Sequence, residues 1–464
     1  MQLQRYWERV YAMPELKTIQ SYLNTVAEQI RWKRARPVLM QELAQHMEDQ
    51  KDAFASEGLL NAEDLTVKEM GDPVSVGLEL DRVHRPKPQW NLLLFTVFLA
   101  LAGAGFRIWL TSTQGQYYTD IDPTKTILAL VMGCGALILG YFIDCSRIGH
   151  HAGKVYLGAL LVGILVLLLT PKANYASYYT RYVVLCFPVV YAIWLHACRM
   201  KKWFGLIFAI LGGVPLLTIC TLAPHAFGLT MLLLTGFVLL IVAAANDWFG
   251  IGKLKTMIAV SLAGLSMLGM TVLGVLNSNY GIRRLEVAFH PEQDALGIGY
   301  QAYTIRKALS VSQWLGEGKW SQNNFGVSYE TTVPGCDSDA LLTTLIYKLG
   351  WFPFIIVVLA LILLVGWLLY RCLKQKNQLG RMIALSVVMT LSIQAFCSVL
   401  WNLGYTLFSA SFPLVIGNLN TVINMWLIGL ALSVFRGESI ARDSLNSEMP
   451  PLPRYRIKIV VQKI

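Results

Sequence analysis

The sequence predicts an all-α polytopic membrane protein with about ten transmembrane helices, preceded by a small soluble helical domain. Of the 464 residues, 55% are hydrophobic and only 14% are charged, whereas soluble globular chains usually carry about 25% charged residues. The mean hydropathy is +0.50. Apolar segments of roughly 17 to 25 residues, the length that crosses about 30 Å of hydrocarbon, recur along most of the chain. These observations exclude a soluble globular protein, a disordered chain and a disulfide-stapled mini-protein.

The first 89 residues form the predicted soluble domain, because they contain no long apolar run. Helical periodicity is present over 16–30 and 38–54, a break is expected at Pro37, and Gly71-Asp72-Pro73 precedes a last short helix. A basic, proline-containing linker over 84–88 leads to Trp90, where an aromatic residue suits the membrane interface. No signal peptide is recognisable, so we expect this domain to stay in the cytoplasm.

Ten apolar segments follow and make up a predicted membrane domain over 90–436. The segment that begins near residue 340 is longer than one span requires, so its first residues are expected outside the hydrocarbon. The predicted segments are 90–111, 126–144, 154–170, 181–198, 203–222, 226–246, 256–276, 340–370, 382–402 and 412–435.

Basic residues fall in every second short loop, which predicts the orientation of the chain by the positive-inside rule. Both termini should therefore be cytoplasmic, and the one long loop, about 277–339, should be extracellular. A basic, proline-rich tail over 437–464 is expected to lie at the cytoplasmic face on anionic lipid. The basic loop residues are Arg147, Lys154, Arg199, Lys201, Lys202, Lys253, Lys255, Arg371, Lys374, Lys376 and Arg381.

The net charge of +11 does not indicate nucleic-acid binding, because of where it lies. Residues 1–89 hold 12 of the 39 Lys and Arg but 14 of the 28 Asp and Glu. The positive excess therefore belongs to the membrane domain, where it acts on topology and lipid headgroups. Of the eight cysteines only Cys336 lies in the long loop, so no disulfide within that loop is expected. No Walker loop or Cys/His metal spacing is present, which disfavours an ATP-driven pump.

The long loop is the predicted functional region, because polar residues collect there outside the bilayer. It contains Arg284-Leu-Glu-Val-Ala-Phe-His-Pro291, then Asp294-Ala-Leu-Gly-Ile-Gly-Tyr300-Gln301, then Pro334-Gly-Cys-Asp-Ser-Asp339 with Leu349-Gly350 following. This order resembles the outer-loop signature of the SEDS family, the FtsW/RodA/SpoVE peptidoglycan polymerases. Gln394-Ala-Phe396, Asn402-Leu-Gly404 and Pro413-Leu414 resemble that family's ninth and tenth spans.

The chain also departs from the pattern of the family it resembles. Ala223-Pro224-His225 stands where the family has Gln-Pro-Asp, and Asp337 stands at the His of the family's Pro-x-x-His-Thr-Asp motif. The first 89 residues, with Met70-Gly-Asp-Pro73 and His84-Arg-Pro-Lys87, resemble the helical permease-prefix domain of some membrane proteins.

The resemblance implies a peptidoglycan glycosyltransferase of the cell membrane that polymerises lipid II, with a class B penicillin-binding transpeptidase as partner. Asp339 matches the family's catalytic Asp, and a carboxylate there is a suitable base for a sugar hydroxyl. Asp337 is the candidate ligand for a divalent cation, Mg²⁺ or Mn²⁺. The expected pyrophosphate and substrate contacts are Arg283, Arg284, Arg306, Lys307, Tyr300 and Gln301.

Two groups of alternatives remain open at this stage. Asp339 precedes an apolar helix, so its side chain could instead cap that helix. The protein could also be a non-catalytic scaffold that binds lipid II, or a transporter of lipid-linked precursors. A polymerase needs Asp339 and a precursor-sized groove beside it, a scaffold needs neither, and a transporter needs a continuous polar path through the membrane.

Overall fold

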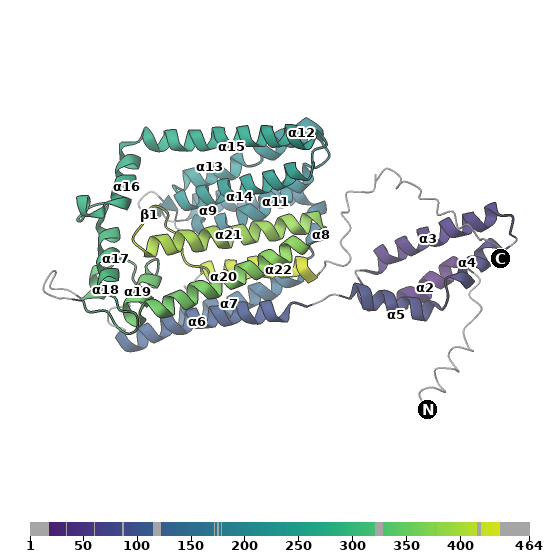
Figure 1. Cartoon of the computed structure of the whole chain (residues 1–464), viewed down its shortest axis with the longest axis horizontal. Coiled ribbons are helices and arrows are strands. Elements are labelled where there is room, and N and C mark those ends of the chain that lie inside the picture. The colour runs from purple at the N-terminus through teal and green to yellow at the C-terminus, as the bar shows by residue number, and fades with distance from the viewer. Residues whose placement is uncertain are drawn as a thin grey trace, which may run out of the picture. The chain divides into compact units, whose positions relative to one another are not determined.

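A computed structural model describes the chain as two compact units that divide between Pro88 and Gln89. Figure 1 shows the elements of each unit. The described residues are 18–33, 35–59, 61–85, 88–114, 122–170, 172–173, 176–177, 179–320, 328–375, 377–414 and 419–436. The predicted basic tail over 437–464 lies outside the described residues.

The described residues of the N-terminal unit form four helices, α2 (Ile19–Gln29), α3 (Arg36–Ser56), α4 (Ala62–Glu69) and α5 (Pro73–His84). Their apolar sides meet in a core that includes Tyr22, Val26, Leu39 and Met47. The break expected at Pro37 is wrong in its position. Pro37 lies in the first turn of α3, where a proline costs no hydrogen bond, and the chain turns before it. Sequence periodicity did not predict α4, which is only eight residues long.

Asp72 begins α5 as the Gly-Asp-Pro pattern indicates. Its carboxylate accepts hydrogen bonds from the backbone N–H groups of Val74 and Ser75 at 3.3 and 3.0 Å. Gly71 has a φ of +77°, a left-handed conformation that glycine adopts at little cost. The turn therefore ends one helix and caps the next.

The second unit contains ten helical segments long and apolar enough to cross a membrane, counted over the described residues. They are Trp90–Ser112, Pro123–Phe142, Ala152–Leu169, Thr180–Ala197, Lys202–Leu222, Ala226–Ala245, Lys253–Leu276, Trp351–Lys374, Gln378–Asn402 and Leu419–Arg436. In element order they correspond to α6 (Trp90–Gln114), α7 (Pro123–Phe142), α9 (Ala152–Leu169), α10 (Thr180–Val183) with η1 (Val184–Cys186) and α11 (Phe187–Ala197), α12 (Lys202–Leu211) with α13 (Val214–Leu222), α14 (Ala226–Ala245), α15 (Lys253–Leu276), α20 (Trp351–Lys374), α21 (Gln378–Asn402) and α22 (Leu419–Arg436).

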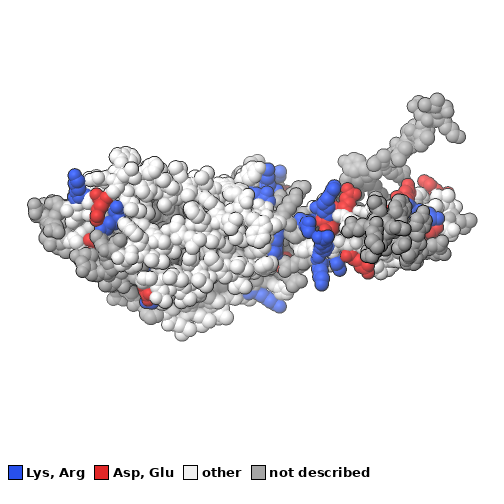
Figure 2. All heavy atoms as spheres, turned by 90° about the horizontal axis from the view of Figure 1, so that it is seen from below, with Lys and Arg blue, Asp and Glu red and all other residues white. Residues whose placement is uncertain are grey.

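Large apolar side chains on these helices face outward, as they do in a lipid bilayer. Leu169 is 78% exposed, Met270 74% and Leu254 73%. Figure 2 shows a wide band without charged side chains across the second unit, with charged residues near its two ends. The protein is therefore a multi-pass, all-α membrane protein, as the sequence predicts.

The structure refines two of the predicted apolar segments. The long segment at 340–370 divides into α19 (Leu341–Leu349) and α20, which confirms that its first residues precede the span. Gly350 makes this division: its φ is +102°, and a Cβ added there would lie 2.5 Å from the carbonyl oxygen of Trp314. The last span begins at Leu419 rather than 412, because Phe412, Pro413 and Leu414 belong to a non-helical segment.

The remaining elements lie mainly between α15 and α20 or connect the spans. They are α16 (Asn279–Phe289), η2 (Pro291–Asp294), α17 (Tyr300–Ser310), α18 (Tyr329–Thr332) and the short α8 (Cys145–His150). A two-stranded antiparallel hairpin pairs β1 (Lys172–Ala173) with β2 (Ala176–Ser177), with Lys172 opposite Ser177. Helices α16 to α19 gather at one end of the bundle, here called the loop end (Figure 1).

Candidate active site at the loop end of the bundle

Asp339 lies at the loop end, immediately before α19, with its side chain 25% exposed. Its Oδ2 accepts a hydrogen bond from Ser409 Oγ at 3.3 Å, and its Oδ1 accepts one from Ser411 Oγ at 3.3 Å. The first helical residue of α19 is Leu341, and its N-cap is Ala340, which makes no side-chain cap. The capping role considered for Asp339 is therefore wrong, because its carboxylate is directed to the segment between α21 and α22.

Arg181 supplies a positive charge beside this carboxylate. Its Nη1 lies 3.9 Å from Asp339 Oδ2, and its side chain is 21% exposed. Its Nη2 also donates to the hydroxyl of Tyr182 at 3.0 Å. Arg181 begins the fourth span, more than 150 residues before Asp339 in the sequence, so only the folded bundle brings the two together.

A small cavity with both polar and apolar lining residues lies next to Arg181. Its volume is about 20 Å³, and Arg181, His225, Gln394, Ser409 and Ser411 are among the residues that line it. This is room for roughly one water molecule. Burial, together with the nearby Arg181 and against the effect of Asp339, lowers the pKa of His225 to about 4. The imidazole of His225 is therefore neutral at pH 7.

Gln394 and Asn402 of α21 hold the two sides of the site. Gln394 Nε2 donates to the carbonyl oxygen of Ser411 at 3.0 Å and to Asn420 Oδ1 at 2.7 Å. Asn402 Nδ2 donates to the carbonyl oxygen of Asp339 at 3.0 Å. Both amide side chains are fully buried. They fix the backbone of the Ser409–Ser411 segment and of Asp339, so that the carboxylate meets its hydroxyl donors.

Tyr300 and Gln301, predicted to bind substrate, contact the loop that precedes Asp339. Tyr300 Oη donates to the carbonyl oxygen of Thr332 at 3.0 Å, and Gln301 Nε2 donates to that of Pro334 at 3.3 Å. These contacts position the loop from α17. A direct contact of either residue with a substrate stays a prediction.

The four cations predicted to bind pyrophosphate lie in different surroundings. Arg306 donates to the carbonyl oxygens of Ala288 and Phe289 at 2.8 Å each and of Gly404 at 3.3 Å. Arg283 pairs with Asp294 at 3.2 Å. Arg284 donates to the carbonyl oxygen of Leu407 at 3.3 Å, and Lys307 lies 5.6 Å from the centre of the Trp320 ring. Arg306 thus has a sufficient structural role, and a pyrophosphate role for any of the four stays a prediction.

Asp337, the candidate metal ligand, is 9% exposed. Over the described ranges, no three His, Cys, Asp or Glu side chains are gathered as a metal site. Arg181 Nη1 lies 3.9 Å from one oxygen of the Asp339 carboxylate. These residues alone do not make a metal site.

Sequence reasoning did not select Arg181, His225, Ser409 or Ser411 as site residues. A signal existed for two of them, because Arg181 is one of few basic residues outside the alternating basic loops and His225 stands in place of an acidic motif residue. The two serines carry no such signal.

All eight cysteines are free, and burial raises the pKa of Cys336 to about 12, so this loop thiol is unreactive.

Comparison with known proteins gives consistent results for the membrane domain. A profile of the FtsW/RodA/SpoVE family, described as cell cycle protein, matches residues 90–438. A probable peptidoglycan glycosyltransferase FtsW of Xanthomonas oryzae pv. oryzae is 27% identical over 301 residues, which cover 61% of this chain and 59% of that protein. The match thus spans less than two thirds of the relative.

A second relative and a solved structure extend the comparison. A probable peptidoglycan glycosyltransferase FtsW of Idiomarina loihiensis is 23% identical over 379 residues, 75% of this chain and 87% of that protein. A chain from a peptidoglycan synthase complex that coordinates polymerization and crosslinking has a TM-score of 0.57 and 15% identity. It covers 75% of this chain and 98% of its own length, a likeness that shows a common fold.

Proposed function

Because this chain belongs to the FtsW/RodA/SpoVE family, we propose that it is a peptidoglycan glycosyltransferase that polymerises lipid II at the outer face of the cytoplasmic membrane. The observation that carries the proposal is the meeting of Asp339 and Arg181 at the loop end, 3.9 Å apart and both partly exposed. A proton acceptor and a fixed positive charge are the two groups that this reaction requires.

The proposed reaction is attack of a sugar hydroxyl of one lipid-linked chain on the anomeric carbon of another. The carboxylate of Asp339 accepts the hydroxyl proton as the new glycosidic bond forms. The bond from the anomeric carbon to the pyrophosphate oxygen breaks, and the departing undecaprenyl pyrophosphate takes the electron pair. Arg181, which lies beside Asp339, is the cation that we propose to stabilise the negative charge of this leaving group.

Ser409 and Ser411 orient the proposed base. Each hydroxyl donates to a different oxygen of Asp339. Together with Asn402 on the backbone, they hold the carboxylate in one orientation before substrate arrives, which reduces the reorganisation needed in the transition state.

An apolar groove in the membrane domain supports a substrate with a long isoprenoid chain. The groove has a volume of about 500 Å³ and lies between α14 and α15, where Leu232, Phe237, Leu240, Gly264 and Leu268 are among its lining residues. The share of α15 that is buried is 6%, the smallest of the ten described spans, so this groove borders on lipid. The undecaprenyl chain of lipid II is the occupant we propose.

We propose a divalent cation, Mg²⁺ or Mn²⁺, only for the protein with its substrate bound. Asp337 and Asp339 would have to share it with oxygens of the pyrophosphate, because the described residues gather fewer than three suitable ligands. When bound, such an ion would neutralise charge on the leaving group. No step of the proposed reaction depends on it.

The orientation and the partner are also proposals. The alternation of basic loops supports cytoplasmic termini and an extracellular loop end. Similarity to a chain of a peptidoglycan synthase complex supports a class B penicillin-binding transpeptidase as partner. Under this topology the N-terminal helical unit is cytoplasmic.

The test is polymerisation by the purified full-length protein with lipid II, with Mg²⁺, with Mn²⁺ and with EDTA. We expect glycan strands from the unaltered protein and none from Asp339→Ala. Absence of product from the unaltered protein, with or without a transpeptidase, combined with measurable lipid II binding, would favour a scaffold over an enzyme. If polymerisation requires Mg²⁺ or Mn²⁺ in this assay, the result would support an ion shared by Asp337, Asp339 and the pyrophosphate.

A further inference from the structure

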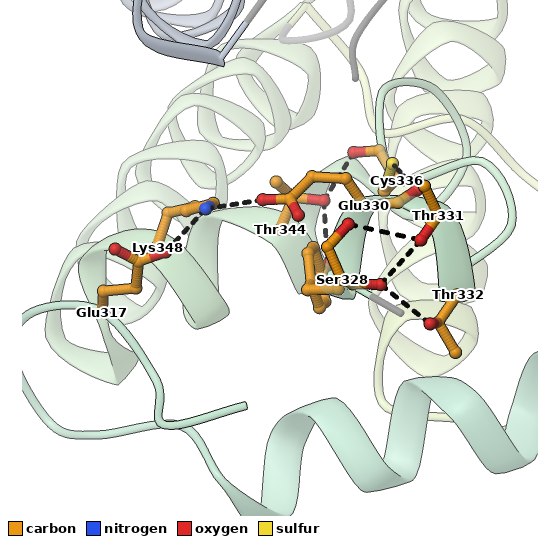
Figure 3. Close-up of polar contacts among 9 residues, drawn as sticks. Glu317, Ser328, Glu330, Thr331, Thr332, Cys336, Thr344 and Lys348 are labelled. Atoms are coloured by element: carbon orange, nitrogen blue, oxygen red, sulfur yellow. Dashed lines mark hydrogen bonds and ion pairs between the residues drawn. The ribbon is translucent and has the colours of Figure 1, made fainter. Parts of the chain in front are cut away.

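A buried lysine lies two turns along α19 from the proposed base. The side chain of Lys348 is 5% exposed, and its Nζ lies 2.6 Å from Glu317 Oε1 and 2.7 Å from Glu330 Oε1. Figure 3 shows the ammonium between the two carboxylates. Glu330 is almost as buried, at 6%, whereas Glu317 is 54% exposed. One lysine thus joins three separate segments: α19, α18 and the 311–320 segment.

The surrounding contacts join the same segments a second time. The rings of Tyr329 and Tyr347 stack with centroids 4.0 Å apart and an angle of 11° between their planes. Trp320 meets both rings edge to face. Gly316 and Gly318 donate backbone hydrogen bonds to Leu349 and Tyr347. Aromatic rings and backbone therefore shield the ammonium from most water, and Glu317 lies on its exposed side.

The contacts continue from this enclosure to the loop that carries Asp339. Tyr329 Oη and Thr344 Oγ1 lie within hydrogen-bond distance at 3.0 Å, and Thr344 Oγ1 donates to the carbonyl oxygen of Cys336. Cys336 Sγ contacts the carbonyl oxygen of Glu330 at 3.5 Å, which returns the chain of contacts to the ion pair. Figure 3 shows Glu317 on one side of Lys348, and Thr344, Glu330 and Cys336 on the other.

The loop itself is a tight turn whose geometry depends on few bonds. The backbone N–H groups of Ser338 and Ala340 both donate to the carbonyl oxygen of Gly335, at 3.0 and 2.8 Å. Asp339 lies between these two donors. A shift of Cys336 would therefore move Asp339 relative to Arg181, Ser409 and Ser411, which belong to other helices and segments.

We propose that Lys348 is a positioning residue: by binding Glu330 and Glu317 it holds the 328–336 segment against α19 and so aims Asp339 at Arg181. A buried ion group is seldom retained for stability, because well-packed apolar residues stabilise as well or better. Such groups can instead enforce one arrangement of the segments that they join. The kinetic part of this inference rests on the proposed function, whereas its structural part does not.

The experiment compares Lys348→Met with Lys319→Met, the same change at an exposed lysine of the neighbouring segment. Backbone hydrogen exchange over 335–345 is measured by mass spectrometry on the full-length protein in detergent. We expect Lys348→Met to speed exchange there by roughly tenfold or more, with α17 unchanged, and Lys319→Met to match the unaltered protein. Unchanged exchange over 335–345 in Lys348→Met would overturn the proposal.

Polymerisation kinetics give the second measurement. A misplaced base lowers turnover more than substrate affinity, so kcat should fall roughly 10- to 100-fold with KM for lipid II within about threefold. If Lys348→Met does not fold, Glu330→Gln, which keeps an acceptor for the ammonium, should show the same direction with a smaller change. A rise in KM alone would overturn the positioning role. An unaltered protein without activity would contradict the proposed function, while the exchange result would still decide the structural part.

Discussion

Asn402 holds Asp339 by its backbone and leaves the carboxylate to other partners. The Nδ2 of Asn402 donates to the Asp339 carbonyl oxygen at 3.0 Å, and its Oδ1 accepts from the backbone N–H of Thr343 at 2.9 Å. A residue of α21 thus fixes both the first turn of α19 and Asp339, two residues before that helix. Because Asn402 holds the main chain of Asp339 and not its side chain, the side chain can be changed without releasing the loop.

Replacement of Asp339 by Asn tests whether the carboxylate acts as a base. Asn keeps the size of the side chain and an acceptor oxygen for one serine, but it is not a proton acceptor at neutral pH. We expect polymerisation to fall by about 10²- to 10⁴-fold, nearly as far as in Asp339→Ala, with the thermal unfolding temperature little changed. Asp337→Asn makes the same change at the other candidate carboxylate. Activity that survives in Asp339→Asn and disappears in Asp337→Asn would move the catalytic role to Asp337.

Replacement of Arg181 by Gln tests the proposed charge on the leaving group. A charge-assisted contact contributes about 1.5–3 kcal/mol, so kcat/KM should fall by roughly 10- to 150-fold. Arg181→Lys, which retains the charge without the planar fork, should recover part of the loss. The measurement is the initial rate of lipid II polymerisation. Equal loss in the Gln and Lys variants would assign Arg181 to packing beside Tyr182 rather than to charge.

Arg306 and Arg283 should respond differently to the same substitution. Arg306→Gln removes a guanidinium that donates to three carbonyl oxygens, so we expect a loss of about 1.5–3 kcal/mol in the free energy of unfolding. Arg283 forms an exposed pair with Asp294, so Arg283→Gln should change stability by less than about 1 kcal/mol. Thermal unfolding in detergent gives the first comparison. A stable Arg306→Gln variant with a raised KM for lipid II would instead favour pyrophosphate binding.

The cap of α5 should make the N-terminal unit sensitive to acid. Partial burial acts to raise the pKa of Asp72, but hydrogen bonds from the Ser75 hydroxyl and from the backbone of Ser75 and Val74 keep it below its ordinary value. The folded state therefore favours the carboxylate, and the stabilisation is present above about pH 4 and lost as the pH falls through the lowered pKa. The protection of the backbone amides of 73–84 from hydrogen exchange, relative to an unstructured chain at the same pH, should fall in that range. Asp72→Ala should show this reduced protection at every pH.

Single cysteines test the orientation of the membrane domain. In a background without native cysteines, Lys319→Cys should react with an impermeant reagent from outside intact cells, and Lys374→Cys only after the cells are opened. Both residues are exposed, whereas the neighbouring Gln375 is buried against the carbonyl oxygen of Val434 and would be a poor site. Labelling of both positions from the same side would contradict the ten-span arrangement.

The sequence by itself determined the class of the protein and most of its spans. Apolar length is a local property, because every span must satisfy its own backbone in hydrocarbon, and so each helix is visible in the residues that form it. The Asp72 cap was accessible because a capping turn is also local, whereas the role of Gly350 in dividing α19 from α20 was not predicted. Asp339 was accessible through its motif, and its position after a polar loop and before an apolar helix agreed with that motif.

Tertiary structure alone decided what surrounds Asp339. Arg181 comes from the fourth span, and Asn402 and Ser411 come from the end of α21 and the segment after it, 63 and 72 residues after Asp339. No local pattern links these residues to a carboxylate before α19. The same reason accounts for Arg306, which looks like an available cation in the sequence but is held by three carbonyl oxygens. It also accounts for Lys348, whose carboxylate partners lie 18 and 31 residues earlier and reach it only when the loop folds back onto α19. Hydrogen bonds and ion pairs across distant segments depend on the packing of the whole bundle. The sequence therefore determined which charged and polar groups are present, and the tertiary structure determined which of them pair.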